Sequence, residues 1–97
     1  MSVQFIALIS VKHPDKMNEY KKVSSDALAK HQGKVLGGLP APEALEATGE
    51  IPDVIAILEF PSIDHARAWR QDPDLAPVHA LRNGAGSSTI LALPALK

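Results

Sequence analysis

The sequence predicts a single α+β domain of the ferredoxin-like type, in which a four-stranded antiparallel sheet in the order βαββαβ carries two helices on one face. The 97 residues contain no repeat, linker or low-complexity stretch, so residues 1–97 are expected to form one domain. Two runs, at 3–11 and 53–60, are almost continuously apolar and rich in β-branched residues, as strands are. Apolar residues recur at helical spacing after each run, which predicts a helix behind each of these strands.

The first helix is expected from Pro14 to Gln32, directly after the strand at 3–11. Pro14 suits the first turn of a helix, where its missing N–H costs nothing. The residues that recur at helical spacing are Met17, Tyr20, Val23, Ala27, Leu28 and His31. Gly33 is expected to end this helix in the left-handed conformation.

The rest of the chain is expected to form three more strands, of which the one at Asp53–Phe60 is the strongest, and a second helix. The expected elements are a strand at Lys34–Leu39, a proline-rich loop at 40–52, a strand at Asp53–Phe60, a helix at Ile63–Arg70 and a final strand at Thr89–Leu93. Ser62 is placed to cap the N-terminus of the second helix. Pro73 ends that helix and starts a further turn, and Pro77 is expected to break this turn again.

Both strong strands are apolar on two faces, and this pattern predicts a homodimer. Alternate residues of a strand point to opposite faces of the sheet. The apolar residues on the second face are Ile6, Leu8, Ile55 and Ile57. Two helices cover one face only, so these residues or the opposite set would meet water, at roughly 1.5–3 kcal/mol each. We expect a second copy to pack on the open sheet face; a C-terminal tail or a loop lying over it is the alternative.

Composition excludes several classes of protein. The net charge of −1 gives no broad attraction to nucleic-acid phosphates or anionic lipid. The chain has no cysteine, which excludes thiolate nucleophiles and cysteine-ligated zinc and is compatible with a reducing cytoplasm. The N-terminal apolar run lacks the features of a signal peptide, and no run is long enough to span a membrane. We expect a cytoplasmic protein that binds neither nucleic acid nor membrane.

No motif predicts a metal or a cofactor. The four histidines show no H-x-H, H-x-x-x-H or H-E-x-x-H spacing, so we expect no metal site. The glycines fit neither the P-loop pattern nor G-x-G-x-x-G, so no nucleotide cofactor is expected. An RNA-recognition module has the same element order but stacks bases on aromatic side chains of its central strands, and the strand at 53–60 offers Phe60 alone.

Glu59 and Arg82 are the first candidates for chemistry. Glu59 lies near the end of an apolar strand, where partial loss of hydration would suit its carboxylate to general acid or base catalysis. An ion pair with a neighbouring basic residue is the alternative. Arg82 follows a helical turn and could hold a carboxylate with two hydrogen bonds or pair with Glu59; an arginine stabilising a helix end at the surface is its alternative.

Two histidines and two aromatic residues complete the candidate site. His31 lies on the apolar stripe of the first helix and is a candidate catalytic residue, or else a packed histidine. His79 precedes Arg82 by three positions, so both lie on one helix face and could line a pocket. Tyr20 and Trp69 occupy stripe positions and are candidates for ligand contact, or else core residues.

The order of several short motifs resembles the family catalogued as domain of unknown function 1330, in the dimeric α/β-barrel superfamily. The matching features are Tyr20, His31-Gln32-Gly33-Lys34, Gly49, Glu59-Phe60-Pro61-Ser62, Ala66, Trp69, Pro73 and Arg82, which span residues 3–94. The resemblance implies a ferredoxin-like dimer and no particular activity. Superfamily relatives include cofactor-independent monooxygenases, decyclising isomerases and stress-related binding proteins.

Some positions depart from the pattern of that family. The departures are Gln32 in place of a first glycine, Thr48 in place of an acidic residue, Arg70 and Leu75 where tyrosine is common, and Gly84 and Gly86 in a segment that is usually more helical. If the polar and aromatic positions bind ligand, these differences put a substrate shared across the family in doubt.

Three functions remain open at this point. The first is cofactor-free proton abstraction or isomerisation of a small organic acid or enol between sheet and helices. Glu59 would be its acid/base, Arg82 its anion-binding group and His31 a further catalytic residue. The second is a non-catalytic ligand-binding or scaffold dimer, in which Glu59 and Arg82 form a structural pair. The third is a cofactor-independent oxygenase, which needs an electron-rich aromatic substrate and an apolar cavity.

Overall fold

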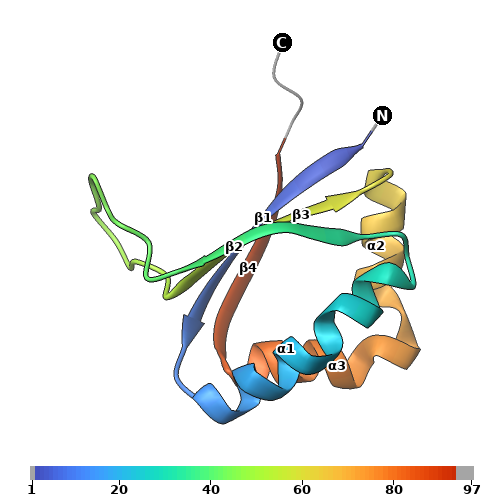
Figure 1. The fold of residues 1–97 in the computed structure, drawn as a ribbon, viewed down its shortest axis with the longest axis horizontal. Coiled ribbons are helices and arrows are strands. Elements are labelled where there is room, and N and C mark those ends of the chain that lie inside the picture. Colours follow the sequence, from blue (N-terminus) through green and yellow to red (C-terminus); the bar gives the residue numbers. More distant parts are fainter. Residues whose placement is uncertain (1, 94–97) are drawn as a thin grey trace.

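The computed structural model describes residues 2–93. Its elements are β1 (Val3–Val11), α1 (Pro14–Ala29), β2 (Lys34–Pro40), β3 (Val54–Phe60), α2 (Ile63–Gln71), the 3-10 helix η1 (Pro73–Leu75), α3 (Ala76–Gly84) and β4 (Gly86–Leu93). The strands form one antiparallel sheet in the order β2-β3-β1-β4. The helices all lie on one side of this sheet (Figure 1). The predicted ferredoxin-like α+β fold is confirmed.

The first helix ends earlier than predicted. α1 stops at Ala29, and Gln32, with φ 62°, is the residue in the left-handed conformation. The expectation that Gly33 would take this conformation is therefore wrong. Glycine is required at position 33 for another reason, because a Cβ there would lie 2.5 Å from the ring of Phe60. The backbone N–H of Gly33 also donates to the carbonyl of Leu28 and closes the helix end.

The second helical region is longer than predicted. Pro77 lies in the first turn of α3, where no N–H is needed, so it starts a helix instead of breaking one. The structure consequently has a third α-helix, and β4 begins at Gly86 instead of Thr89. The predicted cap of α2 is confirmed: the Oγ of Ser62 accepts a hydrogen bond from the backbone N–H of His65 at 3.2 Å. No helix between residues 2 and 93 combines the length and hydropathy of a membrane span.

The core lies between the helices and the facing side of the sheet. Phe5 and Phe60 meet edge to face, with ring centroids 5.6 Å apart, and Phe60 lies 5.6 Å from Trp69 of α2. Leu28 of α1 is 2% exposed beside them. These large side chains fix the position of α1 and α2 on β1 and β3.

The opposite side of the sheet is apolar and carries no helix. The predicted set Ile6, Leu8, Ile55 and Ile57 lies there, and each of these side chains is half-buried. Strand register aligns Ile57 with Ile6 and Ile6 with Leu91, which is 50% exposed. The loop at 41–53 projects beyond the sheet (Figure 1). Within residues 2–93 this face remains open.

Gly86→Ala is expected to destabilise the protein strongly. A Cβ at Gly86 would collide with the backbone carbonyl of Ser10 on β1. The strands cannot separate easily there, because the N–H groups of Lys12 and His13 both donate to the carbonyl of Ala85. We expect a loss of about 2–3 kcal/mol and a fall in Tm of roughly 10–20 °C in thermal unfolding followed by circular dichroism.

Gly37→Ala is the matched control. A Cβ at Gly37 would have no atom within 4 Å, and alanine suits a strand at least as well as glycine does. Its Tm should stay near that of the wild type, and equal Tm values for the two variants would contradict the packing at Gly86.

Candidate functional site

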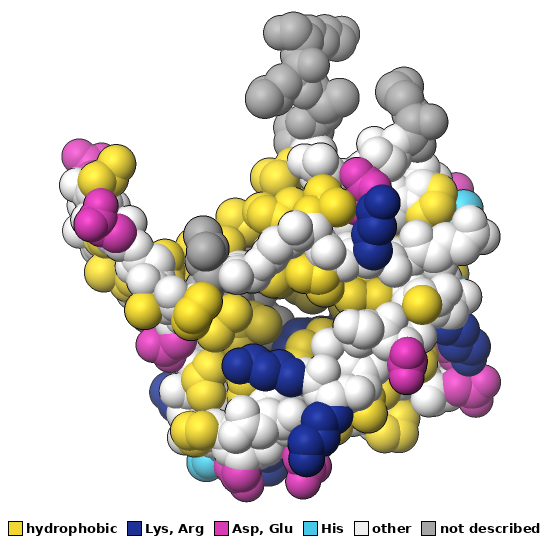
Figure 2. Space-filling view, in the orientation of Figure 1, with side chains coloured by type: hydrophobic (Ala, Val, Ile, Leu, Met, Phe, Trp, Pro, Cys, Tyr) yellow, Lys and Arg dark blue, Asp and Glu magenta, His cyan; other side chains and the backbone are white. Residues whose placement is uncertain are grey.

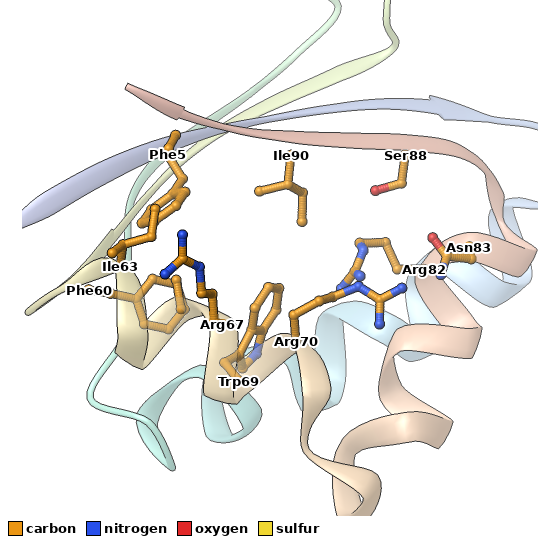
Figure 3. A pocket seen from close by; sticks show the side chains of 12 residues that line it. Phe5, Phe60, Ile63, Arg67, Trp69, Arg70, Arg82, Asn83, Ser88 and Ile90 are labelled. Carbon is orange, nitrogen blue, oxygen red and sulfur yellow. The ribbon is translucent and has the colours of Figure 1, made fainter. Parts of the chain in front are cut away.

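A cavity of about 380 Å³ lies between the helix-facing side of the sheet and the helices α2 and α3. Its apolar lining residues are Phe5, Phe60, Ile63, Ala66, Trp69, Ile90 and Ala92, and its polar ones are Arg67, Arg70, Arg82, Asn83 and Ser88. Arg70 and Arg82 lie at the same end of the cavity as Asn83 and Ser88, and Phe5 lies at the other end (Figure 3). The site therefore combines apolar rings with a cationic end, defined by Arg70 and Arg82, while a third cation, Arg67, lies near Phe5 at the other end (Figure 3).

The guanidinium of Arg82 is the most deeply buried polar group of this cavity. The residue is 2% exposed, and its Nη1 donates to the Nδ1 of His79 at 3.0 Å and to the hydroxyl of Tyr20 at 3.3 Å. Its Cζ lies 5.2 Å from the centre of the Trp69 ring and 5.5 Å from that of Tyr20. No carboxylate between residues 2 and 93 pairs with Arg82. A buried charge without a counterion is costly.

His79 holds Arg82 in place as a neutral base. Its Nε2 lies 2.9 Å from the carbonyl oxygen of Trp69, which only accepts, so Nε2 carries the proton. Its Nδ1 then accepts from Arg82. Burial lowers the pKa of His79, and the positive charges of Arg82 and Arg70 lower it further, while the Trp69 carbonyl opposes this. Both ring nitrogens are therefore engaged at neutral pH.

A second, smaller cavity of about 160 Å³ lies on the other side of Arg82. Arg82 and Ile90 line both cavities, and the smaller one is otherwise bounded mainly by apolar residues, with Tyr20 on its α1 side. The surface is hollowed between the sheet and the helices, with hydrophobic side chains around the opening and Lys or Arg atoms inside it (Figure 2). The side chain of Arg82 thus lies between the larger and the smaller cavity and contributes to the wall of both.

Glu59 lies outside both cavities, on the open side of the sheet. It precedes Phe60 on β3, and strand alternation turns the two side chains to opposite faces. Its carboxylate lies 3.4 Å from the Nζ of Lys34 and accepts a hydrogen bond from the hydroxyl of Ser2 at 3.2 Å. The alternative in which Glu59 pairs with Arg82 is therefore wrong, because the sheet separates the two side chains. The alternative of an ion pair with a neighbouring basic residue is confirmed, and that residue is Lys34.

His31 also lies apart from the cavities, in a charged cluster that joins α1 to the end of α2. Its Nε2 and the Nζ of Lys30 each lie 2.8 Å from the same oxygen of Asp72, and Lys30 also reaches Asp74 at 3.2 Å. Hydrogen bonds from Lys30 and then from His31 hold the pKa of Asp72 well below its usual range. The hydrogen bonds to Asp72 and Asp74 raise the pKa of Lys30.

The structure brings together four of the six predicted site residues. His79, Tyr20 and Trp69 are joined through Arg82. Arg82 and Trp69 line the larger cavity, Tyr20 lines the smaller one, and His79 lines neither. Arg70 lies at the cationic end of the larger cavity but was not among the predicted site residues. Neighbouring residues of a helix point about 100° apart. Arg70 was therefore expected to point away from a site that includes Trp69. The cavity extends far enough around α2 to be lined by both residues.

The fold and the cavity together define the class of this protein. The molecule is a ferredoxin-like α+β protein with a cavity between its sheet and its helices. The chain belongs to the family described as domain of unknown function, DUF1330, whose family model matches residues 2–96. The resemblance inferred from the sequence is thereby confirmed. A comparison with curated proteins gives no match.

Solved structures similar to this chain share its fold. A protein of unknown function from Rhodopseudomonas palustris superposes with a TM-score of 0.75 at 20% identity, covering 99% of this chain and 83% of that one. A dimeric ferredoxin-like protein of unknown function from Jannaschia sp. gives 0.72 at 10% identity, with 98% and 100% coverage. SnoaB, a cofactor-independent oxygenase from Streptomyces nogalater, gives 0.71 at 14% identity, with 99% and 94% coverage. At these identities the similarity establishes the fold alone.

Asp72→Asn is expected to lower stability at pH 7 by an amount that shrinks as the pH falls. The pKa of Asp72 is lowered in the folded state, so its contribution is present above the ordinary carboxyl pKa of about 4 and declines as the pH falls below that value. Urea unfolding at pH 7, 4 and 2.5 should show a difference from wild type that shrinks in that order.

Asp64→Asn is the control for this change. Asp64 forms an exposed pair with Arg67 at 3.3 Å, and such pairs contribute little. A difference between wild type and Asp72→Asn that stays constant from pH 7 to pH 2.5 would show that the ionised Asp72 does not stabilise the fold.

Proposed function

We propose that this protein binds a small organic anion with an apolar body in the larger cavity, and that Arg82 holds the anionic group. The observation that carries the proposal is a buried guanidinium, without a carboxylate partner within residues 2–93, in the wall of an apolar cavity. A bound anion would supply the missing counter-charge. Its apolar body would contact the aromatic rings that line the cavity.

The neighbours of Arg82 have separate roles in this proposal. Trp69 offers its ring to the ligand body and to the guanidinium. His79 and Tyr20 position Arg82 through its Nη1. Among the described residues, the larger cavity is lined by no Asp, Glu or His. Glu59 and His31 lie elsewhere, so binding of an anion fits this geometry better than acid–base catalysis by those two residues.

A cofactor-independent oxygenase is the second candidate function. It is favoured by the structural similarity to SnoaB, together with the apolar cavity and its cationic end. In such a reaction O₂ takes four electrons from an electron-rich substrate: one oxygen atom enters the substrate and the other leaves as water with two substrate hydrogens, so that RH₂ + O₂ yields RO + H₂O. The charge of Arg82 would stabilise the substrate anion. Uptake of O₂ with 1-hydroxy-2-naphthoate, absent in Arg82→Gln, would favour this function over simple binding.

We also propose that the protein pairs with a second copy through the open face of the sheet. Apolar side chains of three strands meet there, and leaving them exposed costs free energy. Solved relatives with this fold are described as dimeric.

Ile57→Lys is expected to disrupt this association. Lysine at the centre of the open face would place a charge in the interface, so sedimentation velocity should show two chains for wild type and one for the variant. Val23→Lys, at a 37% exposed position on α1, is the control and should remain paired. Wild type sedimenting as a single chain at micromolar concentration would refute the pairing.

Arg82→Gln is expected to weaken anion binding. The probe is 2-naphthoate, an apolar body with one anionic group, and its affinity is measured by isothermal titration. Removing a charged hydrogen-bond donor should weaken binding about 10- to 100-fold. Near-UV circular dichroism of Trp69 checks that the variant keeps its packing.

Glu59→Gln is the matched control for the binding experiment. Glu59 lies on the other face of the sheet, in contact with Lys34. Replacing its carboxylate by the amide of glutamine should therefore leave the affinity for the probe unchanged. Equal affinity of wild type and Arg82→Gln would refute the proposed site, and a loss in Glu59→Gln instead would move it to the open face.

A further inference from the structure

We infer that the anion is a carboxylate, bound side-on by the Nε–Nη2 edge of Arg82. The inference rests on the proposed function and names the ligand class of that same site. A guanidinium can form two parallel hydrogen bonds through either of two edges, Nη1–Nη2 or Nε–Nη2. Which edge is free decides how an anion can bind.

The contacts of Arg82 leave the Nε–Nη2 edge free. Nη1 is engaged by His79 and Tyr20. Nε is buried and has no hydrogen-bond partner among residues 2–93. Within the same residues, every side-chain hydrogen bond of Arg82 is made through Nη1. The two donors of this edge are therefore parallel, adjacent and without a protein partner among those residues. Because Nε has almost no accessible surface, a ligand oxygen reaches it only when a neighbouring side chain shifts.

The guanidinium cannot easily turn another edge toward the ligand. Its Nη1 is anchored by His79, which is itself fixed by the hydrogen bond of its Nε2 to the Trp69 carbonyl. The rings of Trp69 and Tyr20 lie 5.2 and 5.5 Å from its Cζ and restrict its plane. Because the donors are held in place before binding, little side-chain entropy is lost when a ligand binds.

A carboxylate matches this edge better than other common anions do. Its two coplanar oxygens accept two parallel N–H bonds in one plane. A sulfonate or phosphate carries three oxygens in a tetrahedral arrangement, so its third oxygen would lie outside the plane of the two N–H bonds, where this edge of Arg82 does not reach it. A phosphate monoester also brings close to two charges, whereas the buried charge here is the single one of Arg82, and Arg70 beside it is exposed.

The remainder of the cavity limits the body of the ligand. The volume of about 380 Å³ and the rings of Phe5, Phe60 and Trp69 suit a flat apolar body up to the size of a bicyclic aromatic acid. Arg70 lies at the same end as Arg82 (Figure 3), and its charge adds to the positive potential there without a fixed geometry. The ligand class is thus an apolar monocarboxylate.

The test compares four probes that share one aromatic body. Isothermal titration of wild type with 2-naphthoate, naphthalene-2-sulfonate, 2-naphthyl phosphate and 2-naphthalenemethanol should show 2-naphthoate binding at least about tenfold tighter than the others. Sulfonate or phosphate binding as tightly as the carboxylate would overturn the inference while leaving an anion site in place. Equal binding of the neutral alcohol would refute the anion site as well.

Arg82→Lys separates the shape of the guanidinium from its charge. Lysine keeps the charge but lacks the paired edge, so the preference for 2-naphthoate over the sulfonate should disappear. If this variant does not fold, the ¹⁵Nε–¹H NMR signal of Arg82 in the wild type gives the same information. A shift of that signal on adding 2-naphthoate supports the side-on bond, and an unmoved signal at saturation, or a preference kept by a folded Arg82→Lys, overturns it.

Discussion

The buried guanidinium of Arg82 is the contact on which the helical layer depends. Through Nη1 it reaches His79 on its own helix α3 and Tyr20 on α1, and it lies over the ring of Trp69 on α2. His79 in turn donates to the backbone of Trp69. Three helices therefore meet at one cation, which is surrounded by neutral acceptors and aromatic rings. These groups stabilise the positive charge without cancelling it.

The position of the cavity follows from how the helices cover the sheet. The large buried side chains come from β1 and β3, where Phe5 and Phe60 pack against α1 and α2. β4 is an edge strand, and its residues Ser88, Ile90 and Ala92 line the cavity. The helices thus pack over the middle of the sheet and leave the facing side of β4 accessible. The cationic end of the cavity arises where α3 approaches this uncovered strand.

The fold could be predicted from the sequence because strand periodicity and turn residues are local signals. Within the candidate site, the contact between His79 and Arg82 could be predicted, because residues three positions apart lie on the same face of a helix. Glu59 was placed with Arg82 because an acid and a base invite pairing, although the alternation that puts Ile57 on the open face puts Glu59 there too. His31 was not placed correctly, because its partner Asp72 lies 41 positions away and only the packing of α1 against the end of α2 brings the two together.

The unpaired charge of Arg82 indicates that the cavity is more than space left over from packing. The chain pairs other charges readily: Lys30 meets Asp72, and Lys34 meets Glu59. An acid beside Arg82 would relieve the cost of its burial in the same way, yet none occupies that position within residues 2–93. Such departures from local consistency concentrate at functional sites. A ligand that supplies the counter-charge would stabilise the folded state in proportion to the logarithm of its concentration, so in this protein binding and folding would depend on the same buried contact.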